Sequence, residues 1–298
     1  MTINNAFLNR IPKTALEAQR QRLYEGWLVF SGNKVAYASL IFLIALVLIA
    51  LFAEWIAPHD PIEIDLSLRL KAASFKYWLG TDELGRDILS RLIFGVRTTI
   101  SIILLIIFFT VPVGVIIGII SGYYGGWVDR VLMRLTDIFL ALPRLILALA
   151  FVAALGPGLV NLVIAISLTS WTYYARISRA ETLLVREENF IKAVRLQGAS
   201  SFYILWHHIV PLCLPSILVR VTYDMAGVVL MAAGFGFLGL GLQPPTPEWG
   251  SMVASGQPYI LDHWWVSTFP GLSIFFISLS LNFLGDGLRD VIDPRYDS

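Results

Sequence analysis

The chain has 298 residues, of which 57% are hydrophobic and only 14% charged, and its mean hydropathy is +0.72, which is the composition of a membrane protein. The net charge of +1 gives no reason to expect nucleic-acid binding. The single cysteine, Cys213, excludes an intrachain disulfide and a cysteine-based zinc site, and the four histidines lack HExxH spacing, so no metal site is predicted.

The N-terminal part of the chain predicts a surface helix followed by a first membrane span. Residues 1–33 are of mixed polarity, and residues 15–30 intersperse leucine and tryptophan with arginine, which is typical of a helix lying at a membrane surface. Residues 34–57 carry no charge after Lys34 until Glu54, and their length suits a hydrocarbon core about 30 Å thick. We therefore predict an N-terminal segment with an interfacial helix at 1–33 and the first transmembrane segment at 34–57.

Residues 58–97 form the longest polar stretch and predict an external loop that leads into the second span. Asp87 lies one helical turn before Arg91, so a local ion pair between them is expected. Neither here nor elsewhere does the sequence offer the carboxylate, base and nucleophile of a hydrolase. No catalytic residue is predicted.

Residues 98–298 are expected to form the membrane-embedded core. Their apolar stretches predict spans at residues 98–122, 130–155, 158–174, 212–242 and 266–288. The sequence therefore predicts an all-α integral membrane fold with six transmembrane helices.

Several ionisable residues fall inside these predicted spans, where a charged group is a functional candidate because burying it is costly. They are Asp137, Arg144, Arg220, Asp224 and Asp286. Arg220 and Asp224 are four residues apart and predict an intramembrane pair on one helix. We favour a structural role for this pair over a proton relay.

Residues 187–211 form a polar island between long apolar runs. Asn189 is a candidate N-cap for a helix over residues 190–197 that Gly198 ends, and a second helix is expected from Ser200 or Ser201 to Pro211. The spacing predicts one apolar face made of Ile191, Val194, Gly198, Phe202 and Leu205.

The same island is predicted to be a docking loop for another protein. A helix of two turns is unstable alone in water and must pack on something to persist. Small residues between Ala193 and Ser201 allow a second protein to approach the backbone closely. The alternative is an ordinary solvated loop.

The distribution of basic residues predicts the orientation. With the N-terminus in the cytoplasm, the internal segments hold fourteen basic residues: Arg10, Lys13, Arg20, Arg22, Lys34, Arg130, Arg134, Arg176, Arg179, Arg186, Lys192, Arg195, Arg289 and Arg295. The external segments hold five, all in the long loop: Arg69, Lys71, Lys76, Arg86 and Arg91. Both termini and the docking loop are therefore expected in the cytoplasm.

The docking loop resembles the EAA loop of binding-protein-dependent ABC importer permeases, in which a Glu-Ala-Ala triplet precedes a glycine and, thirteen residues later, a proline. Here residues 192–194 (KAV) take the place of the triplet, and Gly198 and Pro211 keep the spacing. More narrowly, the chain resembles the C-type permease of dipeptide, oligopeptide and nickel importers. The segments that carry this likeness are residues 79–95, 122–143, 193–200, 234–241, 243–252 and 285–294.

This resemblance implies a type I importer permease fold and a coupling helix seated on an ATPase subunit. The residues expected at that interface are Phe190, Lys192, Ala193, Arg195, Gly198, Ala199, Ser200 and Ser201. The implied partners are two ABC ATPase subunits, which bind ATP and Mg²⁺, a second homologous permease, a periplasmic substrate-binding protein, peptide cargo and the lipid of the bacterial inner membrane. The chain itself has no phosphate-binding loop, so it is expected to hold no cofactor.

The proline-rich segment at residues 243–250 is expected to be a stiff, extended external loop. It is a candidate contact for the binding protein or a cap on the pore. The residues in question are Pro244, Pro245, Pro247, Glu248 and Trp249.

Two other functions remain open at this point. Import of nickel or a metal chelate would use the same architecture, although no His or Cys pair is evident in the spans. A stand-alone ion-coupled secondary transporter would predict internal repeats, and none is convincing between the first three and the last three spans. Peptide import by alternating access is favoured.

Overall fold

The computed structural model describes residue 12 and residues 14–292, and in this part of the chain every regular element is a helix. The first residues of the predicted N-terminal segment and Arg295 of the predicted internal tail lie outside the described residues. The α-helices are α1 Ala15–Gly32, α2 Lys34–Leu51, α3 Ala53–Ile56, α4 Ile88–Tyr124, α5 Gly126–Leu140, α6 Arg144–Leu155, α7 Leu159–Val185, α8 Asn189–Leu196, α9 Ser201–Ile204, α10 Val210–Phe237, α11 Trp249–Gly256 and α12 Trp265–Ile292.

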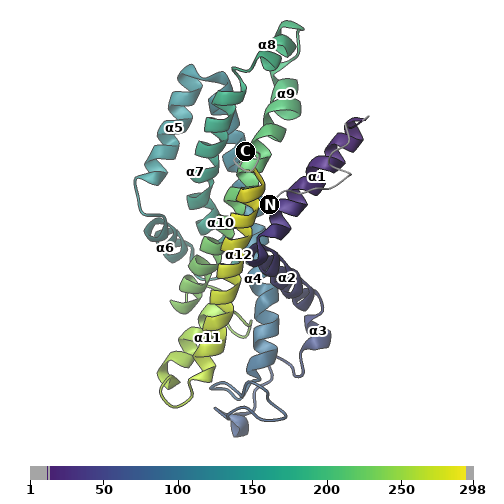
Figure 1. Ribbon diagram of the computed structural model, residues 1–298. Coiled ribbons are helices and arrows are strands. Elements are labelled where there is room, and N and C mark those ends of the chain that lie inside the picture. Colours follow the sequence, from purple (N-terminus) through teal and green to yellow (C-terminus); the bar gives the residue numbers. More distant parts are fainter. Residues whose placement is uncertain (1–11, 13, 293–298) are drawn as a thin grey trace.

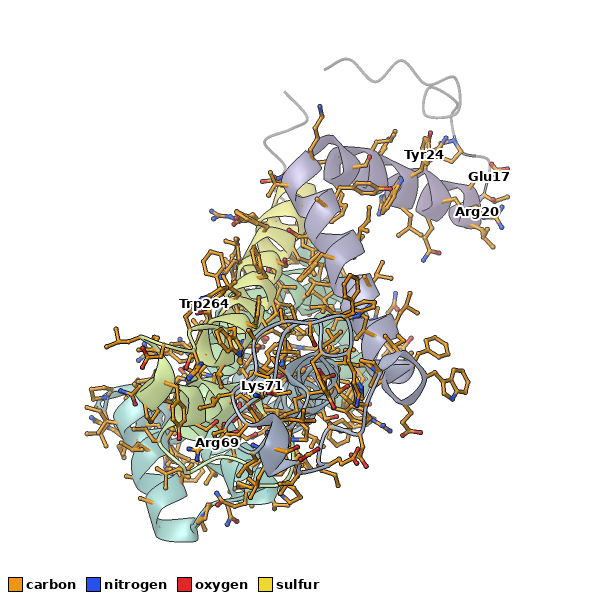
Figure 2. The ribbon with its side chains drawn as sticks, turned by 90° about the horizontal axis from the view of Figure 1, so that it is seen from below. Glu17, Arg20, Tyr24, Arg69, Lys71 and Trp264 are labelled. Atoms are coloured by element: carbon orange, nitrogen blue, oxygen red, sulfur yellow. The ribbon has the colours of Figure 1, made fainter. Side chains whose placement is uncertain are left out.

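The long helices run along one axis, with α8 at one end of the molecule and the loop between α3 and α4 at the other (Figure 1). Helix α1 points away from the body and carries the exposed apolar side chains of Leu16, Leu23 and Trp27. Figure 2, viewed along the axis, shows α1 projecting with Arg20 and Tyr24 on it. These features agree with an interfacial helix, which stays a prediction.

The centre of the fold is the contact between α4 and α7. Three glycines of α4 face α7 so closely that a side chain has no room: an added Cβ would lie 2.6 Å from Tyr174 Cβ at Gly114, 2.8 Å from Ser178 Cβ at Gly118 and 2.7 Å from Thr182 Cβ at Gly122. Small residues permit such close packing of helices where lipid provides no hydrophobic driving force. This contact positions α7, whose end leads into α8.

Four helical stretches are long and apolar enough to cross a membrane: Lys34–Leu51, Ile88–Tyr124, Ser201–Phe237 and Trp265–Ile292. The span predicted at residues 130–155 is not one straight helix, because α5 and α6 are bent by 84° at a break next to Pro143, which cannot continue the preceding helix. If this bent pair counts as one span, the number rises to five. The span predicted at 158–174 lies in the longer α7, and six spans remain a prediction.

The second helix of the docking loop does not end at Pro211, contrary to the sequence-based expectation. A π-helical segment, Leu205–Ile209, joins α9 to α10, and Pro211 lies in the first turn of α10. The wider π turn accommodates a residue that cannot donate a backbone hydrogen bond. The result is one helical rod from Ser201 to Phe237.

The loop before α4 is ordered by buried charges. Arg86 Nε donates to Asp82 Oδ2 at 2.7 Å, and Arg91 Nε lies 3.4 Å from the same oxygen. The expected Asp87–Arg91 pair is therefore wrong: Asp87 instead caps α4 by accepting from Ser90 N–H at 2.9 Å, which satisfies a free backbone donor. Figure 2 shows Arg69 and Lys71 at this end of the molecule.

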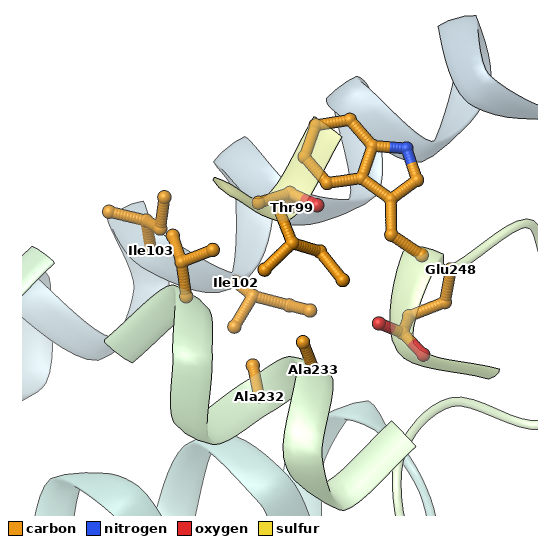
Figure 3. Close-up of a pocket in the computed structure, with 9 residues that line it drawn as sticks. Thr99, Ile102, Ile103, Ala232, Ala233 and Glu248 are labelled. Carbon is orange, nitrogen blue, oxygen red and sulfur yellow. The ribbon is translucent and has the colours of Figure 1, made fainter. Parts of the chain in front are cut away.

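Helix α11 is wedged between α4 and α10. Trp249 donates its indole N–H to the Leu92 carbonyl of α4 at 3.2 Å, and an added Cβ at Gly250 would lie 2.7 Å from Ala233 Cα of α10. Figure 3 shows Glu248 directed toward Ala233 in this region. Residues 247–250 are thus part of the core and not of an extended loop.

We predict that Gly118→Leu lowers the stability of the detergent-solubilised protein. The leucine must push α4 away from α7, and overpacking of this kind costs about 1–3 kcal/mol, which corresponds to a decrease in Tm of roughly 5 °C. Gly234→Leu on α10 is the matched control, because no atom lies within 4 Å of an added Cβ there. Equal Tm values for the two variants would contradict the central role of the α4–α7 contact.

Candidate functional site

The docking loop lies at one end of the molecule, where α8 extends beyond the long helices (Figure 1). Helix α8 spans Asn189–Leu196, so Asn189 is its first residue and not its N-cap; Glu188 takes the N-cap position and makes no side-chain capping bond. The turn after α8 needs Gly198, which has φ of +85°, a conformation that glycine adopts without strain. Gly198 N–H donates to the Arg195 carbonyl at 3.0 Å and closes the turn.

The next helix starts as the sequence predicted. The Ser200 hydroxyl accepts a hydrogen bond from Tyr203 N–H at 3.3 Å and caps α9. Two short helices joined at Gly198 therefore form the loop.

Aliphatic side chains hold the loop against the spans. Ile191, Ile204 and Ile209 are fully buried in a cluster that also contains Ile119 of α4. The predicted apolar face is wrong in two members, because Gly198 is exposed and Phe202 is 70% exposed, while Ile204 takes a buried position. The π-helical segment that follows shifts the register relative to an ideal helix.

The side chains expected at an ATPase interface lie mostly on the outer surface of the loop. Phe190, Lys192, Ala193, Arg195, Gly198 and Ser200 are exposed, and Ala199 and Ser201 are half-buried. An added Cβ at Gly198 would meet no atom within 4 Å, so the backbone there is open to an approaching surface.

The sequence-based interface missed three exposed apolar residues of the same loop. Leu196 is 89% exposed, and Phe202 and Trp206 lie next to each other with ring centroids 6.1 Å apart. Exposed apolar side chains that gather in this way mark contact surfaces. The signal in the sequence that could have found them is the presence of large apolar residues within this polar segment, at positions 196, 202 and 206.

Polar contacts join the loop to the helices beneath it. The Arg195 guanidinium lies 5.2 Å from the ring centroid of Tyr123 on α4. Arg186 donates to the Gly122 carbonyl at 2.6 Å. Further along α7, Arg179 holds Asp129 of α5 through two hydrogen bonds of 2.5 and 2.7 Å. These contacts link α8 to α4, and α7 to both α4 and α5.

The intramembrane charges are arranged differently from the prediction. Asp224 Oδ1 accepts a hydrogen bond from Arg144 Nη1 at 2.7 Å, whereas Arg220 Nη2 is 4.0 Å away. Arg144 Nη2 also donates to the Ser170 hydroxyl at 2.5 Å, and the Tyr174 hydroxyl donates to Asp224 Oδ2 at 3.1 Å. The main partner of Asp224 is thus Arg144 on the broken span, because the bend after α5 directs the start of α6 toward α10.

The proline-rich segment divides into an exposed and a buried part. Pro244 and Pro245 are exposed at a turn, while Pro247, Glu248 and Trp249 are buried, so the last three do not offer side chains to a binding protein. Glu248 caps α11 by accepting from the N–H groups of residues 250 and 251, both at 2.7 Å. Burial raises the pKa of the Glu248 carboxyl, and these two hydrogen bonds act in the opposite direction.

Within the described residues, no group of three or more His, Cys, Asp or Glu lies together in a way that could hold a metal ion. Cys213 is buried in the same cluster as Ile191.

The fold resembles that of solved ABC importers. Two inward-facing structures of the MetNI methionine ABC transporter match with TM-scores of 0.55 and 0.53 at 19% and 21% identity. They cover 68% and 67% of this chain and 97% and 96% of theirs. This likeness shows the type I ABC importer permease fold in the larger part of the chain.

Relatives of similar length match along almost the whole sequence. The di/tripeptide transport system permease protein DppC of Pseudomonas aeruginosa is 43% identical, with 92% of each chain covered. The probable D,D-dipeptide transport system permease protein DdpC of Escherichia coli is 38% identical, with 95% of this chain and 96% of that protein covered. The glutathione transport system permease protein GsiD of Shigella boydii is 39% identical, with 97% and 96% covered.

Two family descriptions match separate parts of the chain. Residues 22–73 match the N-terminal TM domain of oligopeptide transport permease C, and residues 114–298 match the binding-protein-dependent transport system inner membrane component. The second match contains the docking loop, the Arg144–Asp224 pair and α11. With an all-helical fold, apolar spans and an exposed helix at one end, the chain belongs to the family of binding-protein-dependent transport system inner membrane components, the membrane permease subunits of ABC importers.

Proposed function

We propose that this chain is the C-type permease subunit of a peptide importer of the bacterial inner membrane. The observation that carries the proposal is α8, a short helix with an open backbone at Gly198 and an exposed apolar rim, on a chain of this family. In this role α8 is the coupling helix and rests in a groove of an ATPase subunit.

Alternating access follows from this arrangement. ATP and Mg²⁺ bound by two partner ATPases draw these subunits together, and α8 passes the movement to α7 and to the rod that begins at Ser201. The loop follows α7 in the chain and packs against α4 through Ile119 and Tyr123, so it is expected to move together with these two helices. Cargo crosses between this chain and a second, homologous permease.

The outer end of the chain is proposed to receive the periplasmic binding protein. Pro244 and Pro245 are the exposed members of the predicted contact segment. Pro245 lines a groove of about 660 Å³ together with His59, Asp60 and Glu54. Glu54 is paired with Arg97 at 3.0 Å, so Asp60 is the acidic residue there that favours a basic side chain on the binding protein.

Peptide cargo is supported by the names of the relatives, which are permeases for dipeptides, tripeptides and glutathione. Each of these cargoes carries a free carboxylate and amide groups. Substrate choice is shared with the binding protein, so the permease is expected to recognise features that all such peptides have in common.

The composition of the intact complex tests this proposal. Affinity purification of the chain from its host, followed by mass spectrometry, is expected to recover a second permease and two ATPase subunits. Recovery of a lone chain or a homo-oligomer would contradict it and favour a stand-alone secondary transporter.

Two substitutions at Gly198 distinguish backbone strain in the turn from a side chain that blocks the approach of an ATPase subunit. In Gly198→Asn the new residue tolerates the positive φ, but its side chain covers the open backbone. In Gly198→Ala the added group is smaller, and the positive φ costs about 1 kcal/mol of backbone strain. If an ATPase surface approaches here, Asn is expected to lower ATPase co-purification and peptide uptake at least as strongly as Ala. Full activity of Gly198→Asn would show that only the turn geometry matters.

Charge reversal on α8 is expected to weaken the complex. Arg195→Glu places a negative charge on the exposed face and removes the contact with Tyr123, so the yield of co-purified ATPase should decrease several-fold. Arg134→Glu, on the exposed surface of α5 outside the docking loop, is the control with the same change of charge. Equal ATPase yields from the two variants would remove Arg195 from the interface.

A further inference from the structure

Asp224 forms its hydrogen bond with Arg144, so the Arg220 guanidinium has no close carboxylate partner within residues 14–292. Both oxygens of Asp224 are occupied, one by Arg144 at 2.7 Å and the other by Tyr174 at 3.1 Å. Arg220 approaches Asp224 only to 4.0 Å and makes no hydrogen bond to any residue that the structure describes. Among the described residues, Asp224 is the one carboxylate within 4.0 Å of either guanidinium, and it is hydrogen-bonded only to that of Arg144.

An aromatic ring supports both guanidiniums. Tyr173 lies 4.8 Å from Arg220 and 5.8 Å from Arg144, measured from the ring centroid to the guanidinium carbon. Stacking on an aromatic face holds a guanidinium in place while its N–H donors stay available at the edge. Arg220 is therefore held in position with donors to spare.

Arg220 lines a groove of about 440 Å³ between α7, α10 and α12, a size typical of small-ligand sites. Arg289 of α12 lines the same groove and adds a second cation. The nearby carboxylates of Glu181 and Asp286 accept hydrogen bonds from the hydroxyls of Ser216 and Tyr223, both at 2.6 Å, and in the described part of the chain neither forms an ion pair with Arg220 or Arg289. The groove therefore offers cationic donors to an anion.

The groove lies toward the predicted cytoplasmic side of the membrane. Arg220 precedes the end of α10 at Phe237 by seventeen residues, which is about 26 Å of helix. Exposed apolar side chains cover other faces, for example Ile44 and Leu48 of α2 and Phe108 of α4. Lipid is expected on those faces, and a polar groove suits an aqueous path.

We propose that Arg220, with Arg289 across the groove, binds the C-terminal carboxylate of a peptide as it leaves the membrane on the cytoplasmic side. A guanidinium matches the two oxygens of a carboxylate with two parallel hydrogen bonds. Arg144 is a positioning residue, because it takes the hydrogen bond of Asp224 and so leaves the N–H donors of Arg220 free. The inference rests on the proposed peptide import and adds a recognition site within it.

The test compares a dipeptide with its C-terminal amide. The intact importer with its binding protein is reconstituted in liposomes, and initial uptake rates of Ala-Ala and Ala-Ala amide are measured. Arg220→Gln is expected to lower the acid-to-amide rate ratio about tenfold relative to the unmodified chain, because a charged hydrogen bond is lost only for the acid. The binding protein is the same in both cases, so its own preference cancels.

Two further variants control this measurement. Arg220→Lys keeps the charge but loses the two-pronged geometry, and an intermediate ratio is expected. Arg134→Gln removes a cation from the exposed surface of α5 outside the groove and should leave the ratio unchanged. If Arg220→Gln does not assemble, the Arg220→Lys ratio decides: a value equal to that of the unmodified chain overturns the proposal.

The same two arginines would also bind the phosphate of an anionic lipid. Varying the lipid composition of the liposomes distinguishes that ligand from a peptide carboxylate. Liposomes of phosphatidylcholine alone and with phosphatidylglycerol should give the same effect of Arg220→Gln on the ratio. An effect that requires phosphatidylglycerol and lowers both rates equally would overturn the peptide assignment. If the unmodified importer transports neither peptide, peptide import itself is contradicted. If Arg220→Gln shows normal uptake and an unaltered acid-to-amide ratio, only the carboxylate site is overturned.

Discussion

The close contact between α4 and α7 is the constraint on which the other features depend. Within a bilayer, apolar side chains gain little by leaving lipid for protein, so helices associate through close packing and polar contacts. Gly114, Gly118 and Gly122 allow α7 to lie directly against the α4 backbone. Helix α7 then places Tyr174 beside Asp224 and carries α8 at its far end.

Ion pairs between helices complete this arrangement. Arg179 joins α7 to Asp129 of α5, and Arg144 joins α6 to Asp224 of α10. Asp224 is buried, so removing Arg144 would leave its charge without compensation, at a cost greater than the stability that the pair contributes; the Arg179–Asp129 pair is half-buried and costs less to break. The two halves of the broken span are thus each fixed to a different long helix, and movement at the break must alter both links together.

The membrane class and the turn at Gly198 between two short helices could be predicted because each depends on composition or on neighbours close in sequence. The partner of Asp224 could not, because the spacing of four residues points to Arg220 on the same helix, whereas Arg144 comes near only through the bend at Pro143. Burial of Glu248 was missed for a similar reason: its role as an N-cap becomes visible only once α11 is seen packed against α10.

In the proposed mechanism, the continuous helix from Ser201 to Phe237 would act as a lever. Its 37 residues correspond to about 55 Å of helix, nearly twice the thickness of the hydrocarbon core. A tilt of about 5° around one end would move the other by roughly 5 Å, by the geometry of a rigid helix of that length. If α8 is the coupling helix, a small rotation imposed beside it would therefore be amplified into a displacement of several ångströms at the other end of the rod.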